Sequence, residues 1–282
     1  MDKKLKLAVI GSPIRHSKSP EIHQDFANQF DAKIEFTKDR VTPDTLETWL
    51  ADFFKDDGKG VSITLPLKEA ALNYADEISD RARLASACNV IYAKDEKVFA
   101  DCTDGFGLIK DLEENLKFNL KDKKILILGA GGAARGIIPS IIEKNPSQLK
   151  LANRTKSKAI LLKEDLEGKV DLKEKHLIFE AGDLADDFLL ANSYDLIINS
   201  TSVSTLAGES IGLPKTIFSG TKLAYDLFYS AEKTIFMQEA LENGAEKASD
   251  GWGMLVEQGA ESFRLWTNLI PDTSRLLEKP ID

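Results

Sequence analysis

The sequence predicts an α/β protein of two domains, and three observations support this prediction. Short apolar runs alternate with amphipathic stretches along most of the chain, which is typical of mostly parallel sheets covered by helices. The length of 282 residues exceeds what one ordinary core holds. A glycine-rich turn at residues 129–136 follows an apolar strand and opens a helix, which is typical of a nucleotide-binding unit.

The composition restricts the class of protein. Hydrophobic residues make up 43% and charged residues 29%, the balance of a soluble globular protein, and no run of eighteen apolar residues is present. The net charge of −9 disfavours nucleic acid and anionic membranes as partners. The basic N-terminus, MDKKLKLAVIGSP, is interpreted as a first strand because its apolar run is too short for a signal peptide. We therefore expect a cytoplasmic protein.

The cysteines and histidines are too few for a disulfide framework or a metal site. Cys88 and Cys102 are the only cysteines, and they suit a reducing compartment. The three histidines are His16, His23 and His176, and no HExxH motif is present. We therefore expect no metal.

The first hundred residues predict alternating strands and helices. Ser19 is the expected N-cap of the first helix, with Pro20 at its first helical position. The expected strands are at 6–10, 34–40 and 60–65, followed by a hairpin of 89–93 and 97–100, and the expected helices are at 19–30, 44–55, 68–74 and 80–84.

A second unit begins near Gly105. Its expected strands are at 123–128, 148–152, 177–180, 196–199 and 222–226, and its expected helices are at 107–115, 133–143, 156–166 and 231–243. The pattern is helical again at 252–265. Residues 1–104 and 250–282 are therefore expected to form a substrate domain, into which a dinucleotide-binding domain of residues 105–249 is inserted.

The glycine-rich turn predicts a Rossmann-type dinucleotide site. Gly129 allows the tight turn, Gly131 lets the backbone approach a pyrophosphate, and Ala134 keeps the helix close to the strand. The following helix offers free N–H groups and a partial positive charge to phosphates. The expected contacts are Gly129, Ala130, Gly131, Gly132 and Ala133.

The end of the next strand favours NADP over NAD. NAD enzymes usually have an acidic residue there, about twenty residues after the glycines. This chain has Asn153, Arg154 and Thr155, followed by Lys156 and Lys158. A guanidinium can bind a 2′-phosphate through two hydrogen bonds, and Thr155 can add a hydroxyl and cap the following helix.

Four further segments contain polar residues that are unusual in a plain α/β domain. They are residues 11–20, 60–68, 87–90 and 102–107. Within them, Lys68 and Asp104 each follow a predicted strand, where α/β sheets bind their ligands. A lysine beside a carboxylate can move the proton of an alcohol while hydride leaves, or stabilise the alkoxide.

These segments resemble the motifs of the shikimate dehydrogenase family. The family motifs are GxPIxHSxSPxxHN, GxNVTxPxK, GAxNT, NTDGxG, GAGGAARA, NRT, NxTS and GxxMLxxQA. The chain is similar to all eight in the same order, and the last two read NSTS at 199–202 and GWGMLVEQ at 251–258. The resemblance covers nearly the whole length.

The resemblance implies an NADP-dependent dehydrogenase that reversibly reduces 3-dehydroshikimate to shikimate, in the chorismate pathway to aromatic amino acids. It implies Lys68 and Asp104 as the catalytic pair and Thr201 and Met254 as further cofactor contacts. Its implied substrate-binding residues are Ser17, Ser19, Thr64, Lys68, Asn89, Asp104, Tyr229 and Gln258. His16 and His23 are family positions that we assign to hydrogen bonding in the loop and helix. The hydride path is expected in a cleft between the domains, and the protein is expected to be a monomer or a homodimer.

The chain departs from the family pattern at several positions. The main ones are Ser62 for Asn, Val90 for Thr and Cys102 for Asn. Each loss of a hydrogen-bonding group beside a site typically costs about 1 kcal/mol. Two alternatives therefore stay open: a quinate/shikimate dehydrogenase with NAD or a relaxed substrate preference, and a non-catalytic NADP-binding sensor.

Overall fold

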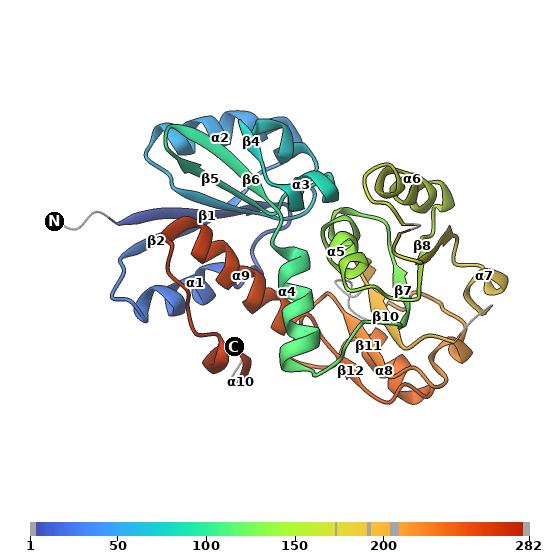
Figure 1. Cartoon of the computed structure of the whole chain (residues 1–282). Coiled ribbons are helices and arrows are strands. Elements are labelled where there is room, and N and C mark those ends of the chain that lie inside the picture. The colour runs from blue at the N-terminus through green and yellow to red at the C-terminus, as the bar shows by residue number, and fades with distance from the viewer. Residues whose placement is uncertain (1–3, 173, 191–192, 204–208, 279–282) are drawn as a thin grey trace. The chain divides into compact units, whose positions relative to one another are not determined.

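The computed structural model describes residues 4–172, 174–190, 193–203 and 209–278, which divide into two compact units (Figure 1). Unit 1 consists of Met1–Lys110 and Leu255–Asp282, and unit 2 of Asp111–Met254. The chain passes from one unit to the other at 110/111 and at 254/255, whereas the sequence placed the boundaries near 104 and 250. Among the described residues, no helix is both long and apolar enough to cross a membrane.

Unit 1 contains a mixed sheet of six strands. Their order is β2-β1-β3-β5-β6-β4. β1 pairs in parallel with β2 and β3, whereas β5 is antiparallel to both β3 and β6, as expected for a hairpin. The strands are β1 (Leu5–Gly11), β2 (Ile34–Arg40), β3 (Gly60–Ile63), β4 (Glu77–Ile78), β5 (Val90–Lys94) and β6 (Lys97–Asp101).

Helices cover both faces of this sheet. One face packs on an apolar cluster that includes Ile10 of β1 and Leu50 and Phe53 of the amphipathic helix α2. On the other face, α1 and α9 meet through aromatic rings, including His23 and Trp266 with centroids 5.0 Å apart. The helices are α1 (Ser19–Asn28), α2 (Leu46–Lys55), α3 (Asp80–Ala85), α4 (Asp104–Lys110), α9 (Trp252–Thr267) and α10 (Ser274–Glu278).

Two sequence predictions for unit 1 need correction, and one strand was not predicted. Helix α1 begins at Ser19 itself, and the preceding Lys18 has no side-chain capping bond, so Ser19 is not the N-cap. The helix expected at 68–74 is a short 3₁₀ turn, Ala70–Tyr74. Strand β4 was not predicted, because two residues are too short to show a periodic pattern.

Unit 2 contains a fully parallel sheet of six strands. Their order is β12-β11-β10-β7-β8-β9, which is 3-2-1-4-5-6 when it is counted along the unit from the β9 edge. The strands are β7 (Lys124–Leu128), β8 (Gln148–Ala152), β9 (Ile178–Gly182), β10 (Leu196–Asn199), β11 (Leu223–Asp226) and β12 (Ala248–Ser249). This order confirms the Rossmann-type prediction.

The sequence placed two further helices inexactly, α8 of unit 2 and the helix expected across the boundary between the units. α8 (Ile235–Glu242) begins after Thr234, whose hydroxyl accepts a hydrogen bond from the Met237 N–H, and not at residue 231. The helix expected at 107–115 is α4 followed by a π-helical turn, Asp111–Asn115. The remaining helices are α5 (Gly132–Glu143), α6 (Lys156–Glu167) and α7 (Asp186–Leu190).

Candidate active site

Lys68 and Asp104 are 36 positions apart in the sequence and form an ion pair in unit 1. Lys68 follows β3 through a turn in which the Leu67 N–H donates to the Thr64 carbonyl, and Asp104 is the first residue of α4. Lys68 Nζ lies 2.5 Å from Asp104 Oδ2, and the two side chains are only 13% and 6% exposed. The expected pair therefore exists in a largely buried setting.

The charge of this pair follows from two opposing effects. Burial alone would lower the pKa of Lys68, but the negative charge of Asp104 and its hydrogen bond raise it by more, so the net shift is upward. Lys68 is therefore an ammonium group at neutral pH. A buried ammonium held by a carboxylate is equipped to donate a proton to an oxygen that gains negative charge.

Asn89 joins the pair to helix α9. Its Nδ2 lies 3.0 Å from Asp104 Oδ1 and 2.9 Å from both Thr103 Oγ1 and Gln258 Oε1, while its Oδ1 accepts from the Thr103 N–H at 2.7 Å. An amide nitrogen has two hydrogens, so it cannot fully satisfy three acceptors. This buried cluster therefore has acceptor capacity that a hydroxyl group of a ligand can use.

The two predicted serines lie together at the start of α1. Ser17 Oγ is 3.1 Å from Ser19 Oγ and accepts from the Ser19 N–H at 3.3 Å. Lys38 Nζ donates to the Ser17 carbonyl at 2.9 Å and adds a positive charge nearby. Thr64 follows β3, and its N–H donates to the carbonyl of Ile10. Ile10 lies near the end of β1, just before the loop that carries the two serines.

His23 has a structural role. Its Nδ1 lies 2.7 Å from the Ser19 carbonyl, one turn earlier in α1, and its ring stacks on Trp266. Burial lowers the pKa of His23 to about 4, so it is neutral at physiological pH. The prediction of helix hydrogen bonding is confirmed for His23, and the one for His16 stays a prediction.

The glycine-rich loop of unit 2 fits a pyrophosphate. Gly129 has φ +103°, and a Cβ there would lie 2.7 Å from Ser200 Oγ, so only glycine suits this turn. A Cβ at Gly131 would meet nothing within 4 Å, which leaves open space beside the loop. Helix α5 begins at Gly132, and no side chain caps it. Its first N–H groups can therefore bind an anion.

The loop after β8 is exposed and cationic. Arg154, Thr155 and Lys158 are all exposed, while Asn153 holds the loop through a bond from its Nδ2 to the Thr155 carbonyl at 2.9 Å. Thr155 is the N-cap residue of α6, but its hydroxyl makes no capping bond, which corrects half of its predicted role. The loop thus presents the guanidinium of Arg154 and the hydroxyl of Thr155, which makes no capping bond, and both groups can bind a 2′-phosphate.

The remaining predicted residues of unit 2 follow strands β10, β11 and β12. Thr201 is held by Asn199, whose Oδ1 lies 3.0 Å from the Thr201 nitrogen and 2.7 Å from its Oγ1. The Tyr229 ring lies 5.9 Å from those of Phe228 and Trp252. Met254 is buried at the last position of the unit.

The sequence reasoning missed three buried residues that hold these groups. Thr103, fully buried, bonds to Asn89 and to the Gln258 carbonyl, and its position next to Asp104 was the available signal. Asn199 also donates to Asp226 at 3.0 Å, and both are fully buried. Asn199 and Asp226 are the last residues of the parallel strands β10 and β11. This position at the end of a strand was the signal that could have identified them.

The two cysteines near the ion pair are free and buried. Burial raises the pKa of the Cys88 thiol to about 12, against a smaller opposing effect of Lys68, and it raises the pKa of Cys102 as well. Both thiols are therefore neutral. Cys102, which departs from the family motif, still donates its backbone N–H to Asp101 Oδ1 at 2.7 Å.

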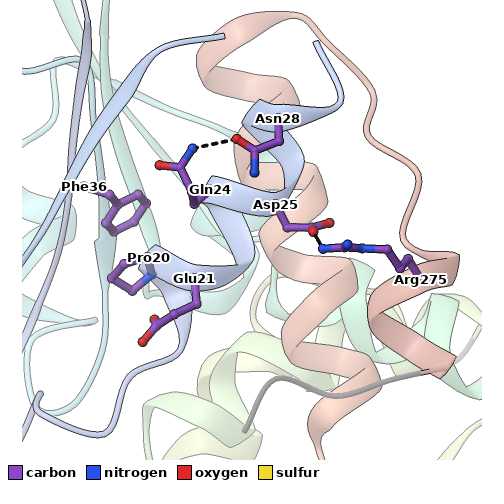
Figure 2. A pocket seen from close by; sticks show the side chains of 7 residues that line it. All are labelled: Pro20, Glu21, Gln24, Asp25, Asn28, Phe36 and Arg275. Carbon is purple, nitrogen blue, oxygen red and sulfur yellow. Dashed lines mark hydrogen bonds and ion pairs between the residues drawn. The ribbon is translucent and has the colours of Figure 1, made fainter. Parts of the chain in front are cut away.

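A groove along α1 is separate from these residues. Figure 2 shows its lining, in which Asp25 pairs with Arg275 and Gln24 donates to Asn28. Its volume is about 590 Å³. None of the predicted site residues lines it, so we do not assign the reaction to this groove.

A fold that binds dinucleotides and a buried group that can deliver a proton define one class of protein: a nicotinamide-dependent oxidoreductase that interconverts an alcohol and a ketone. Comparison with known families makes the assignment specific. The chain belongs to the shikimate dehydrogenase family. It matches the family models described as shikimate dehydrogenase substrate binding domain over residues 9–91, shikimate / quinate 5-dehydrogenase over 111–210, and shikimate 5'-dehydrogenase C-terminal domain over 251–278.

Individual relatives support the same family over nearly the whole chain. The shikimate dehydrogenase (NADP(+)) of Legionella pneumophila is 44% identical over 277 residues, 97% of each chain. An enzyme from Pseudomonas putida called Ael1 has a structure with a TM-score of 0.86 at 37% identity, over 98% of each chain. The Thermus thermophilus shikimate 5-dehydrogenase, solved with NADP(H) and shikimate, has a TM-score of 0.84 at 31% identity, over 97% of each chain.

Proposed function

We propose that this protein catalyses the reversible NADPH-dependent reduction of 3-dehydroshikimate to shikimate. The buried contact between Lys68 and Asp104, with Asn89 bonded to the same carboxylate, is the observation on which the proposal rests. The names of the Legionella and Thermus relatives support the choice of substrate and cofactor.

Lys68 is proposed as the proton donor for reduction. Bound NADPH supplies the hydride. As hydride reaches the ketone carbon, the C=O π bond breaks, the oxygen gains negative charge, and a proton from Lys68 Nζ converts it to a hydroxyl. Asp104 keeps the ammonium oriented and accepts a hydrogen bond from a substrate hydroxyl. Oxidation of shikimate follows the same path in reverse.

The substrate is proposed to bind to unit 1 through its carboxylate and its ring hydroxyls. Ser17 and Ser19 donate hydroxyls to the carboxylate, and Lys38 adds a favourable charge. Asn89, Gln258 and Thr64 bind the hydroxyls. We further propose that Tyr229 lies near the substrate.

Unit 2 is proposed to bind NADP. The loop of Gly129, Ala130, Gly131, Gly132 and Ala133 holds the pyrophosphate on the N-terminus of α5. The exposed loop of Asn153, Arg154, Thr155 and Lys158 binds the 2′-phosphate, and Thr201 and Met254 complete the site.

An absorbance assay of NADPH consumption tests this function. The purified protein is mixed with NADPH or NADH and with 3-dehydroshikimate or 3-dehydroquinate. We expect rapid turnover only with NADPH and 3-dehydroshikimate. Comparable turnover of dehydroquinate with NADH would replace the proposal by the quinate alternative, and NADPH binding without any turnover by folded protein would support the sensor alternative.

A further inference from the structure

Arg81 of unit 1 lies outside the proposed reacting groups but bonds to two elements that carry them. It is the second residue of the short helix α3. Its Nε and Nη2 donate to the two oxygens of Asp101 at 3.0 and 2.8 Å, and its Nη1 donates to Glu261 Oε1 at 2.9 Å. One guanidinium therefore bridges the end of β6 to helix α9.

Both carboxylates are buried, and other donors complete their coordination. Asp101 also accepts from Ser79 Oγ at 2.7 Å, and Glu261 also accepts two bonds from Arg264 at 2.6 and 2.8 Å. Burial alone would raise the pKa of Glu261, but the bonds from Arg264 and Arg81 lower it overall. Glu261 is therefore ionised at neutral pH.

The two carboxylates flank the residues proposed to bind substrate. Asp101 precedes Asp104 by three residues, and its side chain accepts the N–H of Cys102 at the start of the intervening turn. Glu261 follows Gln258 by three residues, close to one turn of α9. A change in the position of either carboxylate would move Asp104 relative to Gln258.

A second link joins helix α9 to the turn that carries Asp104, and it consists of side chains that are themselves proposed to bind the substrate. Asn89 Nδ2 contacts both Asp104 Oδ1 and Gln258 Oε1. If these side chains bind substrate hydroxyls, they exchange part of this mutual contact for the ligand. The link through Arg81 involves no proposed substrate group, so it persists when ligand binds.

From this arrangement we propose that Arg81 is a positioning residue, which fixes helix α9 against the turn that carries Asp104 and so sets the substrate-binding geometry of Gln258. The inference rests on the proposed function. Its effect acts through Gln258 and not through contact with the substrate. Loss of the bridge therefore weakens substrate binding more than it slows turnover.

A double-mutant cycle tests this role. Arg81→Met is measured alone and in a Gln258→Ala background, by shikimate affinity from calorimetry with NADPH present, a pair that cannot react, and by kcat and KM. We expect Arg81→Met to weaken shikimate binding and raise KM about tenfold with less than a threefold change in kcat. In the Gln258→Ala background the same substitution should change the affinity less than twofold. Equal losses in both backgrounds would overturn the proposal.

Further variants separate positioning from general stability. Arg83→Met is the matched control, because Arg83 lies two residues further on α3 and is exposed, and among the described residues its side chain donates only to the Ile78 carbonyl. It should leave affinity unchanged. Arg81→Lys keeps the charge but not the forked geometry, so it should restore only part of the loss.

If Arg81→Met does not fold, Glu261→Gln provides the same test. It weakens one end of the bridge and should raise KM several-fold, again without further effect in the Gln258→Ala background. An unchanged KM in folded Glu261→Gln would contradict the proposal. Affinity is measured directly, so absence of wild-type turnover would refute the proposed function without deciding the role of Arg81, whereas wild-type protein that binds no shikimate would overturn both.

Discussion

The two units build their candidate sites in different ways. In unit 1, the site consists of buried side chains from distant segments, with Lys68, Asn89, Asp104 and Gln258 in one connected cluster. In unit 2, the glycine-rich loop consists of backbone and open space, and its side chains contribute little. Chemistry that moves a proton needs specific functional groups, whereas a pyrophosphate needs only N–H groups and room.

The largest effect is expected from Lys68→Ala. The side chain is the proposed proton donor, and general acid catalysis typically contributes a factor of about 10² to 10⁴. We expect kcat to fall about 1,000-fold while shikimate affinity falls about tenfold or less. Steady-state kinetics beside calorimetric binding distinguishes the two. A large loss of affinity with an unchanged kcat would assign Lys68 to binding alone.

Arg154→Ala should change cofactor preference with little change in the reaction itself. Loss of a charge-assisted contact to the 2′-phosphate typically costs about 1.5–3 kcal/mol, or roughly ten- to a hundredfold in affinity. We expect KM for NADPH to rise by such a factor and KM for NADH to stay near its wild-type value. If KM for NADPH and KM for NADH rise together, Arg154 does not bind the 2′-phosphate. Lys163→Ala, on the same helix as Lys158, is the control.

Two alanine substitutions in the glycine-rich loop should have opposite consequences. Gly129→Ala puts a methyl group 2.7 Å from Ser200 Oγ at a positive φ, so we expect it to lower the free energy of unfolding by about 1–3 kcal/mol. Gly131→Ala meets no neighbour and should leave stability unchanged, but it should weaken NADPH binding about tenfold by occupying the open space. Thermal denaturation and calorimetric titration measure the two effects. Unimpaired NADPH binding by Gly131→Ala would place the pyrophosphate elsewhere.

His23→Gln should alter the pH dependence of stability and leave the chemistry intact. The unfolded His23 takes up a proton below about pH 6.5, whereas the buried ring does so only near its lowered pKa of about 4, so the free energy of unfolding falls as pH drops between these values. This residue contributes about 2 kcal/mol of that loss between pH 7 and pH 5. Denaturant unfolding at pH 7 and pH 5 should show a smaller decrease in the free energy of unfolding for His23→Gln than for the wild type. An unchanged decrease would mean that His23 titrates normally.

The same contrast explains what could be predicted from the sequence. The position of the glycine-rich loop at Gly129 was predicted correctly, because its function depends on the local backbone and on the strand and helix that flank it. Lys68 and Asp104 were expected as a pair only through the resemblance, since no local pattern brings residues 36 positions apart together.

The contacts that hold the site in unit 1 could not be predicted. Arg81 occupies an ordinary position in the sequence, and the place of Thr103 beside Asp104 does not reveal its bond to the Gln258 carbonyl, because both roles arise from the way α9 packs near β6. Likewise, α8 was expected from residue 231, because Ala and Glu favour helix, whereas Thr234 caps the helix through its hydroxyl. Tertiary contacts decide such details.

The most direct test of the central claim is the pH dependence of the single-turnover reduction rate in Asp104→Asn beside wild type. In the wild type, Asp104 holds the pKa of Lys68 above its ordinary value, so the rate should stay flat from about pH 6.5 to about pH 9. In the variant, burial acts unopposed and lowers the pKa of Lys68, so the rate should decline with rising pH within that window. Flat profiles for both proteins, or a decline at the same pH in both, would contradict the assignment of Lys68 as the proton donor that Asp104 keeps charged.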